Sequence, residues 1–330
     1  MSASVSEPRS ESSSPRSIER FDDLMIRSAW LYHQRGWTQE QIAQKFRVSR
    51  ATVARLLQRA VQEGLVRVWF APDAERLMIL EEDLCKRYAL EEAILVPCEP
   101  TPTARQSALA RATAAYLERA LEDGMVVALG TSRTLHEMAS IFSPSRKMPG
   151  CVFVEMSGGV AAEDPRFDTY NVSWQLARAC GGTARHLFTP AVLSSARVKQ
   201  AISSDPRVAE TLQLAANSDM SLLAIGDTIA GCPMFEMARM SQAEIDQLRA
   251  RGAVGEIIGR AYDINGNAVS TSIDDRYLGL TLEQIRKLRF VVAVAGTVTQ
   301  PAAILGALRQ GFIKVMIMDY QTGRALLESD

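Results

Sequence analysis

The chain has 330 residues, which is room for two or three domains, and its composition excludes several classes of protein. Hydrophobic residues make up 47% and charged residues 23%, as in globular domains and unlike disordered or collagen-like chains. No apolar stretch approaches the ~18 residues of a membrane span. Residues 1–20 are rich in Ser, Glu and Arg, unlike a secretory signal peptide. We therefore expect a cytoplasmic protein without membrane contact.

The cysteines and histidines do not form a metal-binding pattern. No C-x-x-C pair or Cys/His cluster is present, and the cysteines are odd in number and widely spaced. We expect reduced thiols, no zinc site and no other cofactor. The cysteines are Cys85, Cys98, Cys151, Cys180 and Cys232.

Positive charge is concentrated near the N-terminus, although the net charge of the chain is only −1. Residues 21–70 contain eight Lys/Arg and four Asp/Glu, a net charge of +4, while residues 1–20 balance and residues 71–330 carry −5. A small basic module on a larger acidic body is typical of a DNA-binding protein with a regulatory domain, because neutralising phosphates needs a local cluster of cations.

The basic module begins after residues 1–20, which we expect to form a disordered tail. Apolar residues recur at helical spacing from about residue 21 until Gly36. Thr38, with Gln41 three residues later, forms a capping-box pattern that predicts a short helix over 39–46. A turn at 47–48 follows, and Ser49 predicts the start of a second helix over 50–63. Glycine is usual at the turn, so a left-handed backbone at Arg47 would cost about 1 kcal/mol.

These two helices fit a helix-turn-helix. Small and apolar residues stand where two crossing helices share a core: Ile42, Ala43, Phe46, Val48, Val53 and Leu56. The second helix exposes arginines beside short side chains, which suits the major groove of DNA. The alternative is a helical hairpin whose arginines form a solvated face. The candidate DNA-binding residues are Thr38, Gln39, Ser49, Arg50, Ala51, Thr52 and Arg55.

Residues 65–70 read Leu-Val-Arg-Val-Trp-Phe, which predicts a strand after the second helix. This strand would make residues 21–71 a winged helix-turn-helix domain or add a short hairpin at its edge. We expect Trp69 and Phe70 to pack against the protein rather than stack on bases.

Pro72 marks a boundary, and residues 72–90 form a separate connecting segment. An amphipathic helix over 74–90 would serve as a linker or as an oligomerisation seam, and the pattern fits both. Its apolar positions are Leu77, Leu80, Leu84 and Tyr88.

Residues 91–330 alternate between apolar strands and helices. Runs at 94–96, 125–129, 151–156, 221–225, 290–295 and 314–318 are followed by Gly/Ser/Thr loops and helices. This predicts an α/β domain with a mainly parallel sheet covered on both faces, whose ligands would bind at the carboxyl ends of the strands. The loop from Gly130 to Thr134 offers backbone amides, hydroxyls and Arg133 to an anion. Steric reasons alone would also explain its composition.

Several motifs in this order resemble the SorC family of bacterial sugar-responsive transcriptional regulators. The first is the helix-turn-helix, residues 37–43 and 49–57. Three others follow: 171–177 with 181–182 and 189–191; 255–260 with Asp263 and Gly266; and 291–296 with 303–304 and 307–308. The order and spacing of these motifs are more specific than any one of them, and the resemblance covers the chain from about residue 22.

The resemblance implies a C-terminal effector domain with the fold of sugar-phosphate isomerases and deaminases, but without their catalysis. It also implies homo-dimers or homo-tetramers that bind palindromic double-stranded DNA operators, as repressors or activators, under control of a small carbohydrate or carbohydrate phosphate. Carried onto this chain, the effector-binding residues would be Gly130, Thr131, Ser132, Arg133, Thr134, Asn171, Glu256, Gly296 and Gln300.

Two of these positions depart from the family pattern. The family usually has a Trp-Gly pair where this chain has Thr131 and Ser132, and the missing glycine makes close approach of a phosphate harder. The family's later loop usually ends in a lysine that contacts the effector and in some relatives forms a Schiff base (an imine) with it. In this chain Gln300 stands at that position. An amide has no charge and cannot form an imine, so we expect a less charged ligand such as a free polyol or sugar.

Two other functions stay open beside the regulator. One is a sugar-phosphate isomerase-like enzyme that would use acids such as Asp227, Glu256, Asp274 and Asp275. Surface acids and turn formers explain Asp274 and Asp275 as well, and we expect His136 and His186 to be packing or surface residues. The other is a ligand-independent DNA-binding scaffold with a degenerate pocket.

Overall fold

A computed structural model of the chain describes residues 22–159, 169–227, 240–295 and 301–329. It divides into two compact units, Met1–Ala74 and Glu75–Asp330. None of the described helices is long and apolar enough to cross a membrane.

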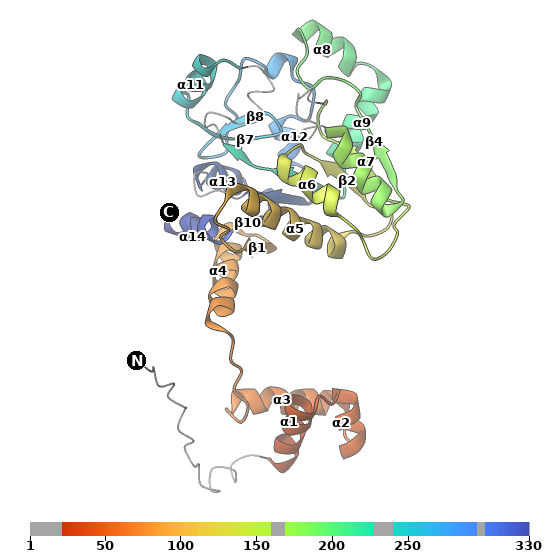
Figure 1. The fold of residues 1–330 in the computed structure, drawn as a ribbon, viewed down its shortest axis with the longest axis vertical. Helices are drawn as coiled ribbons and strands as arrows, with labels where there is room; N and C mark the ends of the chain where they lie inside the picture. The colour runs from red at the N-terminus through yellow and green to blue at the C-terminus, as the bar shows by residue number, and fades with distance from the viewer. Residues whose placement is uncertain (1–21, 160–168, 228–239, 296–300, 330) are drawn as a thin grey trace, which may run out of the picture. The chain divides into compact units, whose positions relative to one another are not determined.

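The smaller unit is built from three helices, α1 (Asp23–Arg35), α2 (Gln39–Phe46) and α3 (Arg50–Gln62) (Figure 1). Gly36 ends α1 in a left-handed conformation, and Thr38 caps α2 in a full capping box with Gln41, as the sequence predicts. The six residues expected to share a core do pack together, and α1 and the C-terminal half of α3 complete the cluster. The helix-turn-helix prediction is therefore confirmed.

The turn between α2 and α3 contains the unfavourable residue that the sequence indicated. Arg47 has φ 56° and ψ 42°, which is left-handed backbone on a residue with a side chain. Its N–H donates to Gln44 O at 3.3 Å, and the N–H of Val48 donates to Ala43 O at 3.0 Å. These bonds satisfy carbonyl groups at the end of α2 and hold the turn in place.

The strand expected over residues 65–70 is absent, so the wing prediction is wrong for the single chain. Residues 67–70 have no regular secondary structure, and Trp69 and Phe70 are 76% and 58% exposed instead of packed. A strand needs a partner, and the described part of this unit consists of helices and irregular chain.

The helix predicted over 74–90 is α4 (Pro72–Tyr88), and the boundary between the two units falls at its third residue. From Glu75 on, the helix belongs to the larger unit, and its C-terminal half is anchored there. There Leu84 and Tyr88 are buried, and the Tyr88 hydroxyl donates to Leu326 O at 2.9 Å.

The larger unit contains a seven-stranded parallel sheet with the order β1-β10-β9-β5-β2-β3-β4. Each strand expected from the sequence is present, so the mainly parallel α/β fold is confirmed. The strands are β1 (Glu92–Val96), β2 (Val126–Leu129), β3 (Val152–Glu155), β4 (Thr183–Arg185), β5 (Met220–Ala224), β9 (Val291–Val294) and β10 (Ile313–Asp319).

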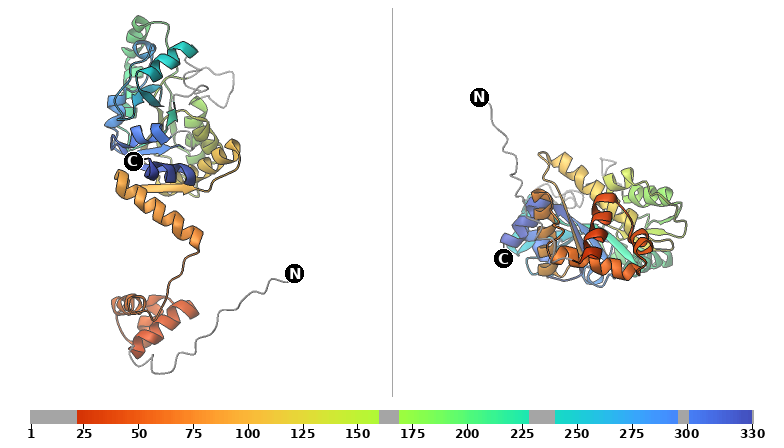
Figure 2. Two further views of the ribbon diagram at one scale, coloured as in Figure 1. Left: turned by 90° about the vertical axis from the view of Figure 1, so that its left-hand side faces the viewer. Right: turned by 90° about the horizontal axis from the view of Figure 1, so that it is seen from below.

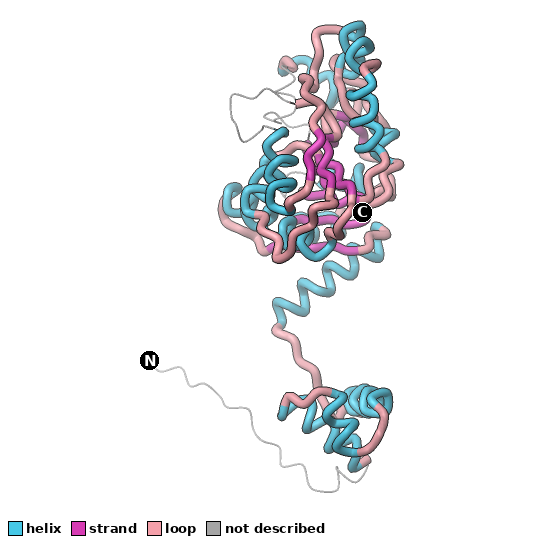
Figure 3. Tube along the Cα trace, turned by 90° about the vertical axis from the view of Figure 1, so that its right-hand side faces the viewer, coloured by secondary structure: helices cyan, strands magenta, loops and turns pink. Residues whose placement is uncertain are grey.

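Helices cover both faces of this sheet, and the strands lie between them (Figure 3). On one face, α5 (Pro102–Ala120), α6 (Arg133–Ile141) and α7 (Thr169–Cys180) pack on Val127, Phe153 and their neighbours. On the other face, α4, α13 (Pro301–Leu308) and α14 (Tyr320–Glu328) pack on Ala128, Val154 and the residues next to them in the core (Figure 2). Adjacent strand residues thus enter opposite cores, which is why the inner strands β2 and β9 are apolar throughout.

A second, smaller sheet was not expected. It is antiparallel and consists of β6 (Gly226–Asp227), β7 (Ala253–Ile257) and β8 (Arg260–Asp263). The remaining described elements are α8 (Ala196–Ser203), α9 (Pro206–Ala216), α11 (Gln242–Ala250), the 3-10 turn η3 (Asp274–Arg276) and α12 (Leu282–Arg286).

Candidate functional site

The candidate DNA-reading surface is the N-terminal part of α3. Ser49 caps the helix, because its hydroxyl accepts from Thr52 N at 3.0 Å and lies 2.9 Å from the Thr52 hydroxyl. Arg50, Ala51 and Arg55 are exposed. Arg59 differs, since its guanidinium bonds Glu63 Oε1 at 2.8 Å one turn later. Cations beside short side chains at a helix start match the donors and small groups that read base edges.

In the larger unit, the first candidate loop begins where β2 ends. Gly130 donates its N–H to Leu222 O at 2.8 Å. A Cβ on Gly130 would lie 3.3 Å from Leu223 Cα and 3.5 Å from Ile258 Cγ1. The loop is therefore held against the turn between β7 and β8, and the fold brings it close to the segment that carries Glu256.

Thr131 and Ser132, which follow Gly130, determine which hydrogen-bonding groups this loop has available for a ligand. Ser132 is the N-cap of α6, and its hydroxyl accepts from Leu135 N at 3.0 Å. Thr131 Oγ1 is buried and has no hydrogen-bond partner within the described part of the chain. The helix start therefore satisfies one amide internally, while an adjacent hydroxyl is left for another group to bind.

Glu256 is the buried carboxyl of the candidate site. It lies on β7 opposite Gly226 of β6, is 7% exposed, and accepts from Gly259 N at 2.7 Å. A Cβ on Gly226 would lie 2.2 Å from Glu256 Oε1, so a side chain there would displace the Glu256 carboxyl from its present position. Burial raises the pKa of Glu256 to about 7; the Gly259 bond opposes the rise and the nearby Asp227 carboxylate adds to it.

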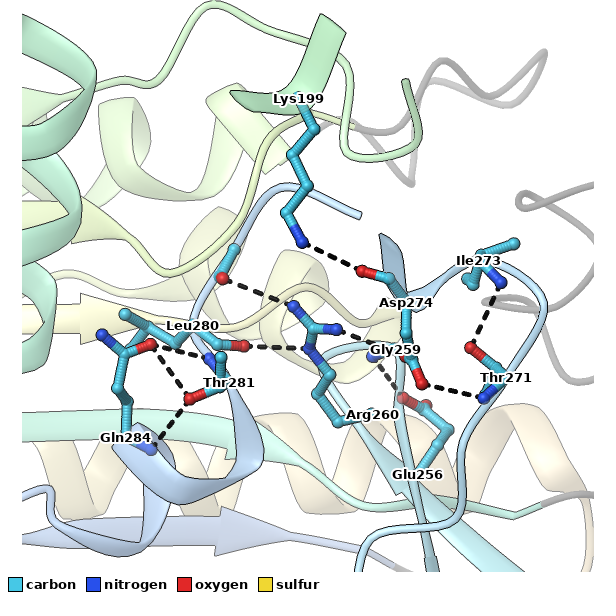
Figure 4. Close-up of polar contacts among 11 residues, drawn as sticks. Lys199, Glu256, Gly259, Arg260, Thr271, Ile273, Asp274, Leu280, Thr281 and Gln284 are labelled. Atoms are coloured by element: carbon cyan, nitrogen blue, oxygen red, sulfur yellow. Dashed lines mark hydrogen bonds and ion pairs between the residues drawn. The ribbon is translucent and has the colours of Figure 1, made fainter. Parts of the chain in front are cut away.

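Arg260 joins this turn to the chain that follows it (Figure 4). Its Nε donates to Leu280 O at 3.0 Å, its Nη1 lies 3.3 Å from Asp274 Oδ1, and its guanidinium stacks 4.7 Å above the Tyr277 ring. Asp274 in turn accepts from Thr271 N at 2.8 Å. The buried guanidinium of Arg260 thus holds η3 and the residues that follow it, 277–280, against the small sheet.

Lys199 extends the same network to α8. Its ammonium donates to Asp274 O at 2.9 Å, and burial, together with the positive charge of Arg260, lowers its pKa. Lys199 is the point at which α8, a helix with no buried residue, hydrogen-bonds to η3. Sequence reasoning missed Arg260 and Lys199 because they lie 14 and 75 residues from Asp274 along the chain. It explained Asp274 by the preference of Asp for turns.

A second polar cluster lies at the end of β3, and it corrects the expectation for His186. Glu155 is fully buried and accepts from Ser173 Oγ at 3.0 Å and Leu187 N at 3.2 Å, with His186 Nδ1 at 2.7 Å. Burial raises the pKa of the Glu155 carboxyl, and these partners oppose the rise. His186 is therefore a member of a buried polar network rather than a packing or surface residue.

Three of the predicted effector residues cannot be placed around this site. Asn171 lies in α7, but its side chain is outside the described residues, as are Gly296 and Gln300. Helix α13 begins directly after Gln300, and its Ala303 O accepts from the buried Tyr262 hydroxyl of β8 at 2.9 Å. The small sheet that carries Glu256 thus also anchors the helix that follows the last candidate loop.

Comparisons with known proteins agree with both units. A family described as a sugar-binding domain matches residues 73–328, and a homeodomain-like domain family matches residues 26–69. The chain belongs to the SorC family of sugar-binding transcriptional regulators.

Relatives with assigned roles match over nearly their whole length. The deoxyribonucleoside regulator of Bacillus subtilis is 31% identical over 308 residues, which cover 92% of this chain and 97% of the relative. The erythritol catabolism regulatory protein EryD of Brucella abortus is 25% identical, covering 93% and 96%. The crystal structure of the full-length sorbitol operon regulator SorC of Klebsiella pneumoniae is 25% identical, has a TM-score of 0.71, and covers 93% and 99%. The chain combines a DNA-binding helix-turn-helix with a sugar-binding domain and is an effector-controlled regulator of transcription.

Proposed function

We propose that the effector of this regulator is an uncharged sugar or polyol, bound at the carboxyl ends of the sheet strands. The site would comprise the loop Gly130–Thr134, Asn171, Glu256 and the loop from Gly296 to Gln300. The observation that carries the proposal is the buried carboxyl of Glu256 with the Asp227 carboxylate near it.

The chemistry of these groups favours hydroxyls over phosphate. The Asp227 carboxylate accepts hydrogen bonds from hydroxyl groups and repels an anion, while the Glu256 carboxyl, with its pKa raised to about 7, both accepts from and donates to hydroxyls. The start of α6, which could otherwise bind a phosphate, already has Ser132 on one of its amides. Thr131 Oγ1, buried without a partner among the described residues, supplies a further hydroxyl for a polar ligand.

At the other end of the chain, we infer that α3 reads the major groove through Ser49, Arg50, Ala51, Thr52 and Arg55. Thr38 and Gln39, at the start of α2, would contact the DNA backbone. Helix N-termini and small hydroxyl side chains bind phosphate oxygens and fix the register, whereas arginines discriminate between bases.

The switch follows from linkage between the two binding events. The effector changes operator affinity only through different affinities for two arrangements of a homo-dimer or homo-tetramer, typically 1–3 kcal/mol of coupling. Helix α4 is the candidate transmitter, because its C-terminal half is anchored in the larger unit by Leu84 and Tyr88. We infer binding without covalent capture at this position, since the resemblance places Gln300 where relatives usually carry a lysine, and an amide cannot form an imine.

Calorimetry of the whole protein with matched pairs of sugars or polyols and their phosphates tests the proposal. We expect the free compound of one pair to bind and its phosphate not to bind. Binding of phosphates alone would overturn the uncharged effector. No binding across the panel, with DNA binding intact, would favour the ligand-independent scaffold, and turnover of a sugar phosphate would show an enzyme.

A pair of glycine variants tests the role of Glu256. Gly226→Ala places a methyl group against the Glu256 carboxylate and should weaken effector binding by tenfold or more, about 1.4 kcal/mol. Gly252→Ala is the control, because a Cβ there meets nothing within 4 Å, although φ is +91°. Equal effector affinity in both variants would place the effector elsewhere.

A further inference from the structure

The segment 65–71, which follows α3, has the composition of a strand but no strand partner. Two β-branched residues, Val66 and Val68, flank Arg67, and the aromatic residues Trp69 and Phe70 follow, all of them types that favour strands. Gly64, with φ +77°, turns the chain out of α3, and Leu65 and Val66 are partly buried against the core of the smaller unit. The base of the segment is thus anchored on the helical unit.

The backbone beyond this anchor is unpaired. Val66 donates its N–H to Ala60 O at 2.8 Å. Residues 67–70 make no backbone hydrogen bond to any described residue. A row of unpaired N–H and C=O groups in an irregular segment of strand-forming residues is what another strand can bind.

The side chains of the segment are also uncovered. Val68, Trp69 and Phe70 are 59%, 76% and 58% exposed. Three consecutive large apolar residues in water mark an interaction surface, because a soluble unit of this size gains by covering them. The partner must therefore supply both backbone hydrogen bonds and apolar side chains.

We propose that Val66–Phe70 pairs with the same segment of a second copy of this chain, as a two-stranded antiparallel ribbon across a two-fold axis. A helix-turn-helix that reads palindromic DNA acts as a symmetric dimer, and a two-fold interface uses the same patch on both copies. The inference rests on the oligomeric operator-binding function proposed above. An isolated two-stranded ribbon is marginally stable, but here each strand stands on a helical core through Leu65 and Val66.

The sequence favours one register. With the axis at Val68, Val66 faces Phe70 of the second copy, and Arg67 faces Trp69. These are β-branched–aromatic and cation–aromatic pairs, both favourable across strands. With the axis at Arg67, two guanidinium groups would face each other, which is destabilising.

Cysteine cross-linking of the full-length chain tests this register directly. A residue on the two-fold axis lies opposite the same residue of the second copy. The two Cβ atoms are then about 5 Å apart, which is close enough for a disulfide. We expect mild oxidation to convert most Val68→Cys chains to linked dimers. Ala71→Cys is the matched control. Residue 71 lies three residues from the axis on each strand, so at ~3.4 Å per residue the two cysteines of the pair would be about 20 Å apart. The unsubstituted chain measures the background from its exposed Cys98.

Equal cross-linking of both variants, or none above background in Val68→Cys, would overturn the ribbon. A chain that is oligomeric and binds effector and operator, yet shows no Val68→Cys cross-link, would overturn this inference alone and leave the proposed function intact.

Hydrogen exchange of the unsubstituted full chain gives a second measurement without any change in sequence. In the absence of DNA, we expect the amides of Arg67 and Trp69 to exchange at least roughly tenfold slower than in an unstructured peptide, because alternate residues of a two-stranded ribbon donate their N–H to the partner strand and Val66 N–H already bonds Ala60 O. Exchange at the unstructured rate would contradict the pairing. Protection that appears only after DNA is added would show that the segment contacts DNA instead.

Discussion

The DNA-binding unit and the ligand-binding unit acquire their functional groups in different ways. In the first, Thr38, Ser49 and Arg55 lie in one short stretch, and the caps that position them are made by neighbours in sequence. In the second, Gly130 lies against Ile258, next to the strand that carries Glu256, and β6 with Asp227 pairs with that same strand, so segments from separate parts of the chain are brought near one another by the two sheets. Local sequence therefore defines the first site, whereas topology defines the second.

The largest expected effect tests whether the second site depends on its long-range network. Arg260→Met removes a buried cation and leaves Asp274 and Leu280 O without that partner. We expect a loss of about 3–4 kcal/mol in the unfolding free energy of the larger unit, measured by urea denaturation. Arg260→Lys keeps the charge and should lose less. A shift below about 1 kcal/mol for Arg260→Met would show that the network is not structural.

The buried carboxyl should make the stability of the larger unit depend on pH. The pKa of Glu256 is about 7 in the folded chain against 4.5 as its ordinary value. Its contribution is therefore fully present below pH 4.5 and is lost as the pH rises through 7, an effect of roughly 3–4 kcal/mol. Compared with Glu256→Gln, the native chain should lose stability over this window in calorimetric scans. Parallel pH profiles would contradict the raised pKa.

Two arginines of α3 should differ in their effect on DNA binding. Arg55→Ala should weaken binding to an operator by about 1–3 kcal/mol without a change in stability, because Arg55 is exposed and available for a base. Arg59 is engaged by Glu63, so Arg59→Ala should cost less in the same binding titration. The opposite order would move the DNA contact toward the end of α3.

Loss of the α2 cap should weaken only the smaller unit. Thr38→Ala removes the oxygen that accepts from Gln41 N, which costs about 1 kcal/mol of unfolding free energy. Thermal unfolding of the full chain should show the lower stability in one transition and leave the other unchanged. A shift of both transitions would mean that the two units unfold together.

The smallest expected effect is a gain. Arg47 holds a left-handed turn at φ 56°, and its side chain is exposed. Arg47→Gly should therefore stabilise the smaller unit by up to about 1 kcal/mol, offset in part by the greater freedom of glycine in the unfolded chain. Chemical denaturation measures this change in the unfolding free energy of the smaller unit. A clear loss of stability would show that the Arg47 side chain makes contacts that outweigh the strain.

This difference between the units explains which predictions from sequence succeeded. Thr38, Ser49 and the turn at Arg47 were identified because caps and turns are short-range, and the six strands because buried parallel strands are apolar throughout. The small sheet of β6, β7 and β8 was missed, since its strands are short and one has two residues. Residues 65–70 read as a strand, but propensity cannot form one without a partner in the same chain.

The candidate effector site could be located only in outline. The ends of the parallel strands indicated the edge of the sheet, and the family resemblance supplied Glu256. Nothing in the local sequence showed that Gly226 lies against that carboxylate, that Arg260 pairs with Asp274, or that His186 bonds the buried Glu155. Each of these contacts joins segments far apart in the chain, and only the fold brings them together.

The most direct test of the account is operator affinity of the full-length chain, measured with and without a free sugar or polyol that binds in calorimetry. We expect the bound compound to change operator affinity by roughly 5- to 150-fold, which corresponds to about 1–3 kcal/mol of coupling. An operator affinity that stays the same at saturating ligand would contradict it, because a ligand that does not distinguish the two arrangements cannot regulate DNA binding.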